Sequence, residues 1–374
     1  MPRIVVVGSL SLDRVVLLPV YPAEDAKLRS ENNVVLECGG GNAGNTAWAL
    51  GRFCGNGNGN GNGNGGKGNE KKNTVDTVEV FSKVGNDQVG QILRSHFNDD
   101  SGIVVGNGAS PTTFIMVTPG GRTCVHTTGD VLPLSVEDTD KRREYFSLAD
   151  HLHFDTRQTV AANHIAHAHL RPTTTVSIDC EKVRVIDGKS DYDFWSLCSS
   201  ARVVFTSKNF PFIFQRGMSE RPLNSLKRDK VNSTVINLFD SELSESERSV
   251  DDVRGAHDKM LRSTIFSKAE VIVTTRGSES IVVTGRDTKK NCFQVDAESV
   301  PVVDSTGAGD VFIAGFLYAL TIRGVHDLRT CVRTGAAAAK AKLASMGARG
   351  ESNWNQEEID EYLLSDPSHS AVPV

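Results

Sequence analysis

Short apolar runs alternate with longer stretches of helical periodicity along most of the chain. The short runs are rich in β-branched residues, which predicts strands, and the stretches between them repeat apolar residues every three or four positions, which predicts helices. Such alternation is typical of an α/β fold built on a largely parallel sheet. The predicted strands are 4–7, 78–81, 174–178, 203–206, 271–275 and 280–284, and the predicted helices are 88–101, 136–149, 158–170 and 242–266.

Two segments have a different pattern, that of paired antiparallel strands. In this prediction 14–19 pairs with 33–38, and 113–118 pairs with 122–127 through a Pro119-Gly120-Gly121 turn. They form a small sheet that projects from the main one, and we call the segments 14–38 and 113–127 the lid. The last third of the chain is predicted to be helical, at 310–322, 327–345 and 356–364. The predicted fold is a single doubly wound α/β domain over 1–374 with a small antiparallel β lid.

One segment, 55–73, lacks the side chains that a core requires. Residues 55–66 alternate Gly and Asn almost throughout, and polar residues and glycine follow. Because no apolar area can be buried there, nothing offsets the entropy of ordering so many glycines. We predict a disordered surface insertion.

Composition and charge narrow the class of protein. The chain has 374 residues, with 41 Lys and Arg against 46 Asp and Glu, a net charge of −5. It has no basic stripe that could neutralise the phosphates of a nucleic acid, so nucleic acid is not an expected partner. No apolar run approaches the roughly 18 residues that span a bilayer. The seven cysteines stand singly, which favours a reducing compartment and no cysteine zinc site. We expect a cytoplasmic protein without a membrane partner.

A loop of small residues, Asp304-Ser305-Thr306-Gly307-Ala308-Gly309-Asp310, leads directly into an apolar helix. Backbone N–H groups at a helix start form an anion site, and Gly307, Ala308 and Gly309 leave room for a phosphate to approach them. Asp310, in the first turn, is placed to act as a base on an alcohol. A base beside an anion site is what phosphoryl transfer requires. The simpler alternative is an acid-capped helix after a glycine turn.

A second glycine-rich segment, 39–50, joins a predicted strand to a predicted helix. Asn42 and Asn45 share a helix face, so both amides can bind one polyhydroxylated ligand, with helix capping as the alternative. Gly39, Gly41 and Gly44 also spell the dinucleotide fingerprint G-x-G-x-x-G. That fingerprint needs an acidic residue about 20 positions further on. None lies between Cys38 and Glu70, which disfavours an NAD-dependent dehydrogenase.

A group of histidines could be taken for a metal cluster: His151, His153, His164, His167 and His169. The sequence pattern predicts a strand on which the first two alternate, and no cysteine or acidic partner repeats at ligand spacing. We interpret all of them as hydrogen-bonded core histidines or surface histidines.

The two glycine-rich motifs, in this order, resemble those of the ribokinase-like (PfkB) family of carbohydrate kinases. Gly8 to Asp13 is similar to that family's first strand and sugar-binding Asp, 84–90 to its V-G-x-D-x-x-G turn, and Thr275-Arg276-Gly277 to its loop near the nucleotide. Within the family the ketohexokinase (fructokinase) branch is the most similar, on the segments 21–25, 40–45, 181–182 and 203–208.

The resemblance implies a role for each matching residue. The base on the sugar's primary hydroxyl is Asp310, and the anion hole is formed by Gly307, Ala308 and Gly309. The implied sugar contacts are Asp13, Gly41, Asn42 and Asn45, and the implied nucleotide site comprises Arg122, Thr275, Gly277 and Asp304. The resemblance also implies a homodimer in which Asp25 of one lid completes the sugar site of the other subunit.

The implied substrates are ATP with Mg²⁺ and a ketohexose such as fructose, with a monovalent cation such as K⁺ as an optional addition. The sequence departs from the family at two positions: Phe212 replaces the Glu of N-x-x-E that organises magnesium, and Ser280 replaces the second Gly of T-x-G-x-x-G. The ketohexokinase branch shares the first departure, and the magnesium ligands stay unassigned. Three alternatives remain: a nucleoside (adenosine-like) or other sugar kinase of this family, a dehydrogenase, and an inactive ligand-binding relative.

Overall fold

The computed structural model describes residues 2–28, 35–55, 78–119, 121–181, 185–186, 189–190, 192–217, 249–287 and 291–365. The chain divides into two compact units. Unit 1 comprises Met1–Leu134 and Val300–Val374, and unit 2 comprises Ser135–Ser299. The predicted insertion, apart from Gly55, lies outside the described residues, so its disorder stays a prediction.

Unit 1 contains three parallel strands of the large sheet, in the order β1 (Ile4–Val7), β4 (Val78–Gly85) and β5 (Ile103–Gly106). All four residues of β1 are buried, as expected for a strand that is covered on both faces. Helix α2 (Gln88–Ser95) is shorter than predicted. The chain turns after α2, where Asp99 accepts a hydrogen bond from the backbone N–H of Ser101. Strand β5 then begins just after the end of the predicted helix 88–101.

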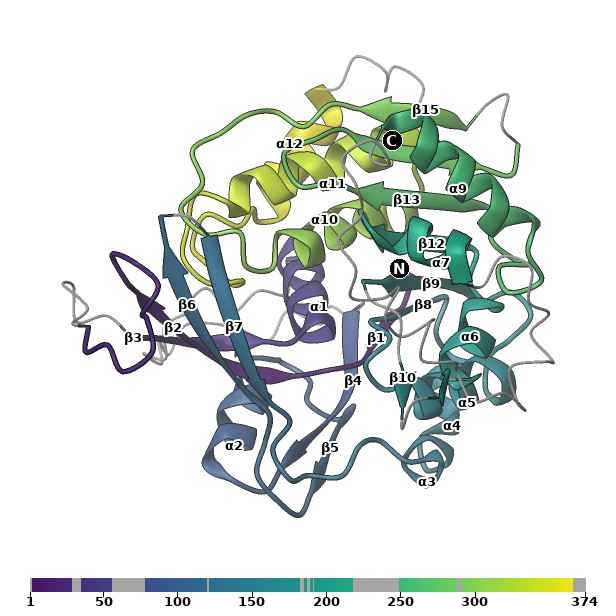
Figure 1. The fold of residues 1–374 in the computed structure, drawn as a ribbon. Coiled ribbons are helices and arrows are strands. Elements are labelled where there is room, and N and C mark those ends of the chain that lie inside the picture. Colours follow the sequence, from purple (N-terminus) through teal and green to yellow (C-terminus); the bar gives the residue numbers. More distant parts are fainter. Residues whose placement is uncertain are drawn as a thin grey trace. The chain divides into compact units, whose positions relative to one another are not determined.

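The four strands of the small sheet are β3 (Val35–Gly40), β2 (Ser11–Leu17), β6 (Thr112–Thr118) and β7 (Gly121–Thr127), in this order (Figure 1). Both predicted antiparallel pairs are present, and β2 and β6 pair in parallel between them. One face of this sheet has its own core, in which Val15, Cys38, Ile115 and Val117 are buried and Met346 packs against them.

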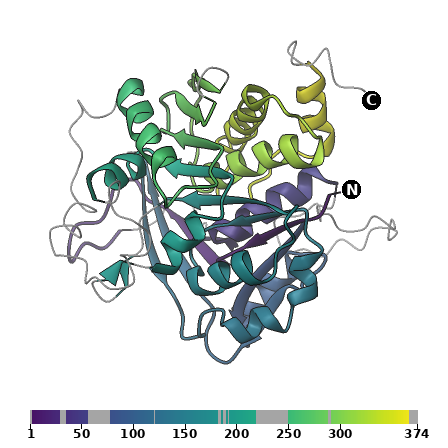
Figure 2. The same ribbon diagram turned by 90° about the vertical axis from the view of Figure 1, so that its right-hand side faces the viewer.

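Three helices of unit 1 pack together: α1 (Asn42–Phe53), α10 (Ala308–Leu317) and α11 (Leu328–Lys342). Figures 1 and 2 show α10 beside α11. Gly315 and Gly335 allow this approach, because a Cβ on Gly335 would lie 2.6 Å from the carbonyl oxygen of Phe312. A π-helical turn, Tyr318–Ile322, completes the predicted helix 310–322, and α12 (Gln356–Ser365) ends the described chain.

Unit 2 contains the rest of the large sheet. Strands β8 (His151–Phe154), β9 (Thr175–Cys180), β12 (Val203–Ser207) and β13 (Val271–Thr275) are parallel, and β14 (Ile281–Gly285) and β15 (Cys292–Val295) continue antiparallel. A separate short pair is formed by β10 (Val185–Ile186) and β11 (Lys189–Ser190). The helices are α3 (Val136–Asp140), α4 (Arg143–Ser147), α5 (Thr159–Ala168), α6 (Tyr192–Cys198), α7 (Phe210–Gly217) and α9 (Val250–Arg262).

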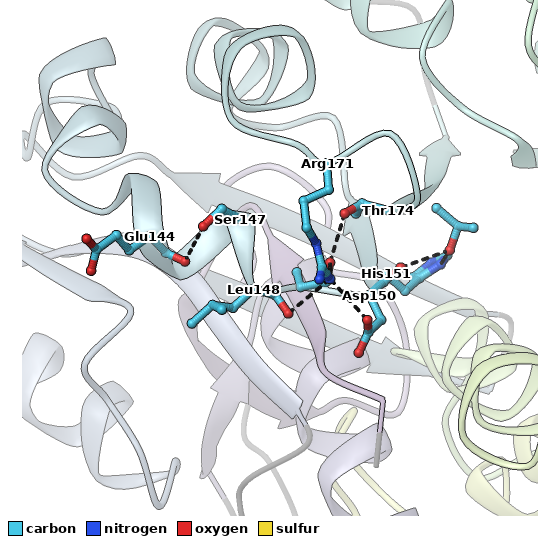
Figure 3. A network of polar contacts seen from close by, with 9 residues as sticks. Glu144, Ser147, Leu148, Asp150, His151, Arg171 and Thr174 are labelled. Carbon is cyan, nitrogen blue, oxygen red and sulfur yellow. Dashed lines mark hydrogen bonds and ion pairs between the residues drawn. The ribbon is translucent and has the colours of Figure 1, made fainter.

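The predicted helix 136–149 is in fact two helices, α3 and α4, because Arg142 departs from helical geometry with φ −122° and ψ 25°. Arg171, which precedes β9, contacts the segment between α4 and β8 (Figure 3). Its Nη2 donates to the carbonyl of Ala149 at 2.8 Å and to Oδ1 of Asp150 at 3.1 Å. The first part of the predicted helix 242–266 lies outside the described residues, and α9 accounts for most of the remainder.

His151 and His153 lie on β8 and are buried with hydrogen-bonding partners on β9. Nδ1 of His151 is 2.7 Å from the hydroxyl of Thr175, and both rings contact the hydroxyl of Ser177. Burial lowers the pKa of His151 to about 4 and that of His153 to about 3, so both rings are neutral. Their interpretation as satisfied core histidines is confirmed. In the described part of the chain, no helix is both long and apolar enough to cross a membrane.

Candidate active site

The loop before α10 is held in place by the carboxylate of Asp304. Its Oδ1 accepts from the backbone N–H of Thr306 at 2.9 Å and from that residue's hydroxyl at 2.7 Å, and its Oδ2 accepts from the N–H of Gly347 at 2.9 Å. Burial acts to raise the pKa of Asp304, but the hydrogen bonds from Thr306 outweigh it and the pKa is lowered. Asp304 is therefore ionised, and its hydrogen bonds stabilise the loop.

Lys342, on α11, donates from beneath the same loop. Its fully buried Nζ lies 2.6 Å from the carbonyl oxygen of Asp304, and burial lowers the pKa of this amine to about 8. At the end of the loop, Gly307 adopts φ 76° and caps α10, a left-handed conformation that glycine adopts without strain. A side chain on Gly309 would meet nothing within 4 Å, so open space lies beside the helix start.

Asp310, in the first turn of α10, is buried against α1. Nδ2 of Asn45 donates to Oδ2 of Asp310 at 2.8 Å, and the hydroxyl of Thr46 lies 3.4 Å from its carbonyl oxygen. The two glycine-rich motifs, which are separated by more than 250 positions, thus meet through a side-chain hydrogen bond. A carboxylate oriented by an amide next to an open helix start can accept a proton from an alcohol.

Asp13 lies on β2 of the same unit. It is 4% exposed, and its Oδ1 accepts from the hydroxyl of Ser11 at 3.0 Å. Burial raises the pKa of Asp13 despite the opposing effects of Ser11 and of the charge on Arg349. Gly40 faces this carboxylate across the strand pair, where any Cβ would come within 2.1 Å of Oδ1. A buried carboxylate with a raised pKa is a common feature of binding and catalytic sites.

Gly41 and Asn42 begin α1 beside these residues. Gly41 caps the helix with φ 81°, and a Cβ there would lie 2.4 Å from the carbonyl oxygen of Ser9. Asn42 is half-buried, whereas Asn45, one turn further, is 4% exposed. Both asparagines lie on α1, three positions apart.

Arg349 is the main residue that the sequence analysis missed. It is buried, and its Nε donates to Oδ1 of Asn45 and its Nη2 to the carbonyl of Gly40, both at 3.3 Å. Nη1 lies 3.2 Å from Nδ1 of His96. Burial lowers the pKa of Arg349 to about 10, so the guanidinium is charged at neutral pH. In the sequence, Arg349 lies in the short Gly347-Ala348-Arg349-Gly350 segment after an Ala-rich helix. This segment matches no motif with a recognisable spacing, so the sequence does not mark Arg349 as a site residue.

The other predicted site residues are more scattered. Arg122, on β7, donates from Nη1 to the hydroxyl of Ser305, which joins the lid to the loop before α10. Asp25 lies in an exposed turn with φ 62°, where Ala26 N–H donates to the carbonyl of Ala23. Thr275 ends β13 and Gly277 follows it with φ 66°, both in unit 2, so they are described apart from the residues of unit 1.

Phe212, which replaces the Glu of the N-x-x-E motif, lies on α7 in unit 2. It is buried in a cluster with Val253, Ala256 and Val282. This position is therefore part of a hydrophobic core and supplies no metal ligand.

Residues 237–355, which include the 304–310 loop, Asp310 and Arg349, match the model of the pfkB family carbohydrate kinases. An uncharacterised sugar kinase of Archaeoglobus fulgidus is 27% identical over 278 residues, which are 72% of this chain and 92% of that protein. The chain is thus similar to pfkB family carbohydrate kinases over residues 237–355 and to a sugar kinase over most of its length.

Solved structures support the same fold for this carbohydrate kinase. A ribokinase of Thermotoga maritima aligns with a TM-score of 0.67 and 16% identity over 97% of this chain and all of that one. The ribokinase of Arabidopsis thaliana complexed with ribose and ATP aligns with a TM-score of 0.65 and 18% identity, over 97% of this chain and 98% of that one. The predicted ribokinase-like α/β fold with a small antiparallel sheet is confirmed. Nothing in these comparisons selects the ketohexokinase branch.

Proposed function

We propose that this carbohydrate kinase transfers the γ-phosphate of ATP to a primary hydroxyl of a ketohexose such as fructose. The observation that carries the proposal is the Asn45–Asp310 hydrogen bond, which orients a buried carboxylate at a helix start with open space beside Gly309. The ribokinase complexed with ribose and ATP has the same fold, which supports ATP and a sugar as the two substrates.

Asp310 is the proposed general base. Asn45 fixes the carboxylate, so that it can take the proton of the attacking hydroxyl. The oxygen of that hydroxyl then bonds to the γ-phosphorus as the bond from the γ-phosphorus to the β–γ bridging oxygen breaks and ADP leaves. The backbone at Gly307, Ala308 and Gly309 is the proposed anion hole for the transferring phosphate, because the positive end of the helix dipole stabilises its charge. The left-handed φ of Gly307 and the open side of Gly309 fit this role.

The proposed sugar contacts are Asp13, Gly41, Asn42 and Asn45. Asp13 can accept hydrogen bonds from sugar hydroxyls, and the amide of Asn42 can both donate and accept. A sugar that donates two hydroxyls to Asp13 would stabilise its ionised form, which burial disfavours in the free protein.

ATP is proposed to bind as Mg·ATP near Arg122, Thr275 and Gly277. The contact between Arg122 and Ser305 supports a lid residue close to the transferring phosphate. Asp304, whose two oxygens both accept hydrogen bonds from the chain, is assigned to holding the nucleotide loop. The metal ligands and any use of K⁺ stay unassigned.

A homodimer with clasped lids is part of the proposal. The face of the small sheet opposite its core carries Phe114 and Val125, which are 44% and 49% exposed. A second lid would cover this apolar surface. Val15 is not part of this exposed surface, because it is buried in the sheet's own core. Asp25, exposed at its turn, is the proposed contribution to the partner's sugar site.

Two experiments test the reaction. Release of ADP is measured with Mg·ATP and fructose, ribose or adenosine. Turnover on fructose well above the others supports a ketohexokinase, whereas preference for adenosine would replace this proposal with a nucleoside kinase. Asp310→Asn should then lower kcat at least about 100-fold, because general-base catalysis contributes about 10² to 10⁴ in rate.

Asp327→Asn is the matched control for Asp310→Asn. Asp327 caps α11 in the same unit by accepting from Thr330 N–H, and Asn is an equally good cap. Its kcat should be unchanged. Near-normal turnover in Asp310→Asn would remove this carboxylate from the mechanism.

A further inference from the structure

Two histidines and one aspartate of unit 2 converge at the junction of α3 and α5. Asp140 is the last residue of α3, His164 lies on α5, and His169 directly follows the end of α5. Nε2 of His164 is 2.8 Å and Nε2 of His169 is 3.0 Å from the same oxygen, Oδ1 of Asp140. One potential ligand atom from each residue lies within 4.8 Å of the others. The sequence analysis found no acidic partner at ligand spacing, and the structure supplies one from another helix.

The imidazole of His169 is not accounted for by ordinary hydrogen bonding. Its side chain is 5% exposed, yet neither ring nitrogen makes a well-aligned hydrogen bond to any residue that the structure describes. The short approach to Asp140 has an ion-pair distance but lacks hydrogen-bond alignment. Burying a polar group without a partner costs about 1–3 kcal/mol, so such groups usually have a further ligand.

The position of the His169 ring is fixed by its neighbours. Its ring stacks on Phe146 of α4 with centroids 6.1 Å apart and planes 6° apart, and it meets the ring of His164 edge-on at 4.9 Å. The two imidazoles thus belong to helix α5 and its end, while the carboxylate comes from another helix. A cation at their common point would join α3 to the end of α5.

We propose that Asp140, His164 and His169 bind a divalent cation of the zinc class. Two imidazole nitrogens and a carboxylate oxygen are a ligand set that Zn²⁺ accepts, with a water in the fourth position. Ligands at about 2.0–2.1 Å in a tetrahedron lie about 3.3 Å apart, so the observed separations of 2.8 and 3.0 Å need to open only slightly. The ion satisfies the buried Nε2 of His169.

The proposed ion has a structural role. Arg171 already fixes the end of α4 through the carbonyls of Leu148 and Ala149 (Figure 3). The metal would hold the end of α3, the helix that precedes α4, against the end of α5. All three ligands lie in unit 2, whereas the proposed base Asp310 lies in unit 1, so metal binding and phosphoryl transfer can be tested separately.

The test is a titration of untagged, chelator-treated full-length protein with Zn²⁺ against a competing chromophoric chelator at neutral pH. We expect one site per chain with a dissociation constant in the micromolar range or below, and we expect His164→Gln and His169→Gln each to weaken it at least about tenfold. The matched control is His167→Gln. His167 is also on α5, but its Nε2 contacts the carbonyl of Ser196, and its loss should leave the affinity unchanged.

Substitution of Co²⁺ supplies a second readout, since cobalt in a site of this kind should give visible absorption that His164→Gln removes and His167→Gln retains. If His169→Gln fails to fold, His164→Gln and Asp140→Asn decide, because both change more exposed side chains. The proposal is overturned if the wild type binds no stoichiometric Zn²⁺, or if His164→Gln and Asp140→Asn bind it as tightly as the wild type.

Discussion

Replacing Arg349 should damage both the stability and the catalytic rate of this kinase. The guanidinium donates to Oδ1 of Asn45 and to the carbonyl of Gly40, and both acceptors are buried. Each acceptor left without a donor costs about 1–3 kcal/mol, and breaking a buried charge network typically costs about 3–5 kcal/mol. Arg349→Met should therefore lower the free energy of unfolding by about 3–5 kcal/mol.

The effect on rate follows from the orientation of one amide. Because Arg349 donates to Oδ1 of Asn45, the Nδ2 group of that amide must face Asp310. Without Arg349 nothing holds Oδ1 of Asn45, so the amide can rotate and its hydrogen bond to Asp310 is weakened. We expect kcat to fall at least about tenfold, equivalent to about 1.4 kcal/mol of transition-state stabilisation.

Arg349→Lys separates the charge from the orientation. Lysine keeps the positive charge but lacks the planar fork that reaches Asn45 and Gly40 together. It should recover part of the stability and little of kcat. Arg52→Met is the matched control: Arg52 also donates to backbone carbonyls, of Asn353 at 2.9 Å and Trp354 at 3.3 Å, and lies over an aromatic ring. It should cost stability without lowering kcat.

Denaturant unfolding and steady-state ADP release measure both quantities. If Arg349→Met has wild-type kcat, or if Arg349→Lys restores kcat fully, Arg349 does not act through the orientation of Asn45. A loss of kcat of the same size in Arg52→Met would mean that any weakening of unit 1 slows the enzyme.

Three further predictions concern residues outside this network. Burial raises the pKa of Asp13, so the ionised form of Asp13 destabilises the fold at neutral pH, and stability is gained as pH falls through the folded-state pKa. Asp13→Asn should therefore raise the unfolding midpoint at pH 7 more than near pH 4. The same substitution should raise KM for the sugar at least about tenfold. Asp25→Ala should raise KM for the sugar more than for ATP, and an active monomer in sedimentation would contradict the clasped homodimer. Replacing residues 55–66 with a short Gly/Ser linker should leave kcat and Tm nearly unchanged, because loop-closure entropy varies slowly with length, and a large loss of activity would place this segment at a ligand or partner.

Local patterns were sufficient to predict much of the fold. Buried β-branched runs gave β1 and β13 with their observed bounds, and the two lid pairs were found from their alternation and turn. Strands β5 and β15 were missed because each has four residues and a mixed burial pattern. Such short segments carry little periodic signal.

The candidate site was only partly predictable for a different reason. The loop before Asp310 and the start of α1 each have a local signature, in which glycines stand where a positive φ or a close approach requires them. Arg349 has none, because its partners Asn45 and Gly40 lie about 300 residues away in the sequence. Its role depends on tertiary packing, which no sequence window contains.

The buried carboxylates of Asp304 and Asp13 in unit 1 have pKa values that are shifted in opposite directions. This difference distinguishes a carboxylate that stabilises a loop from one that binds a ligand. Hydrogen bonds from Thr306 and Gly347 occupy both oxygens of Asp304 and lower its pKa, so its ionised form stabilises the loop. Asp13 receives side-chain hydrogen bonds from Ser11 and Thr113, but burial outweighs them and its pKa is raised. A fold that leaves a buried carboxylate under-solvated loses stability unless a ligand supplies the missing donors. This favours Asp13 as a direct contact for sugar hydroxyls and Asp304 as the residue that positions the phosphate loop.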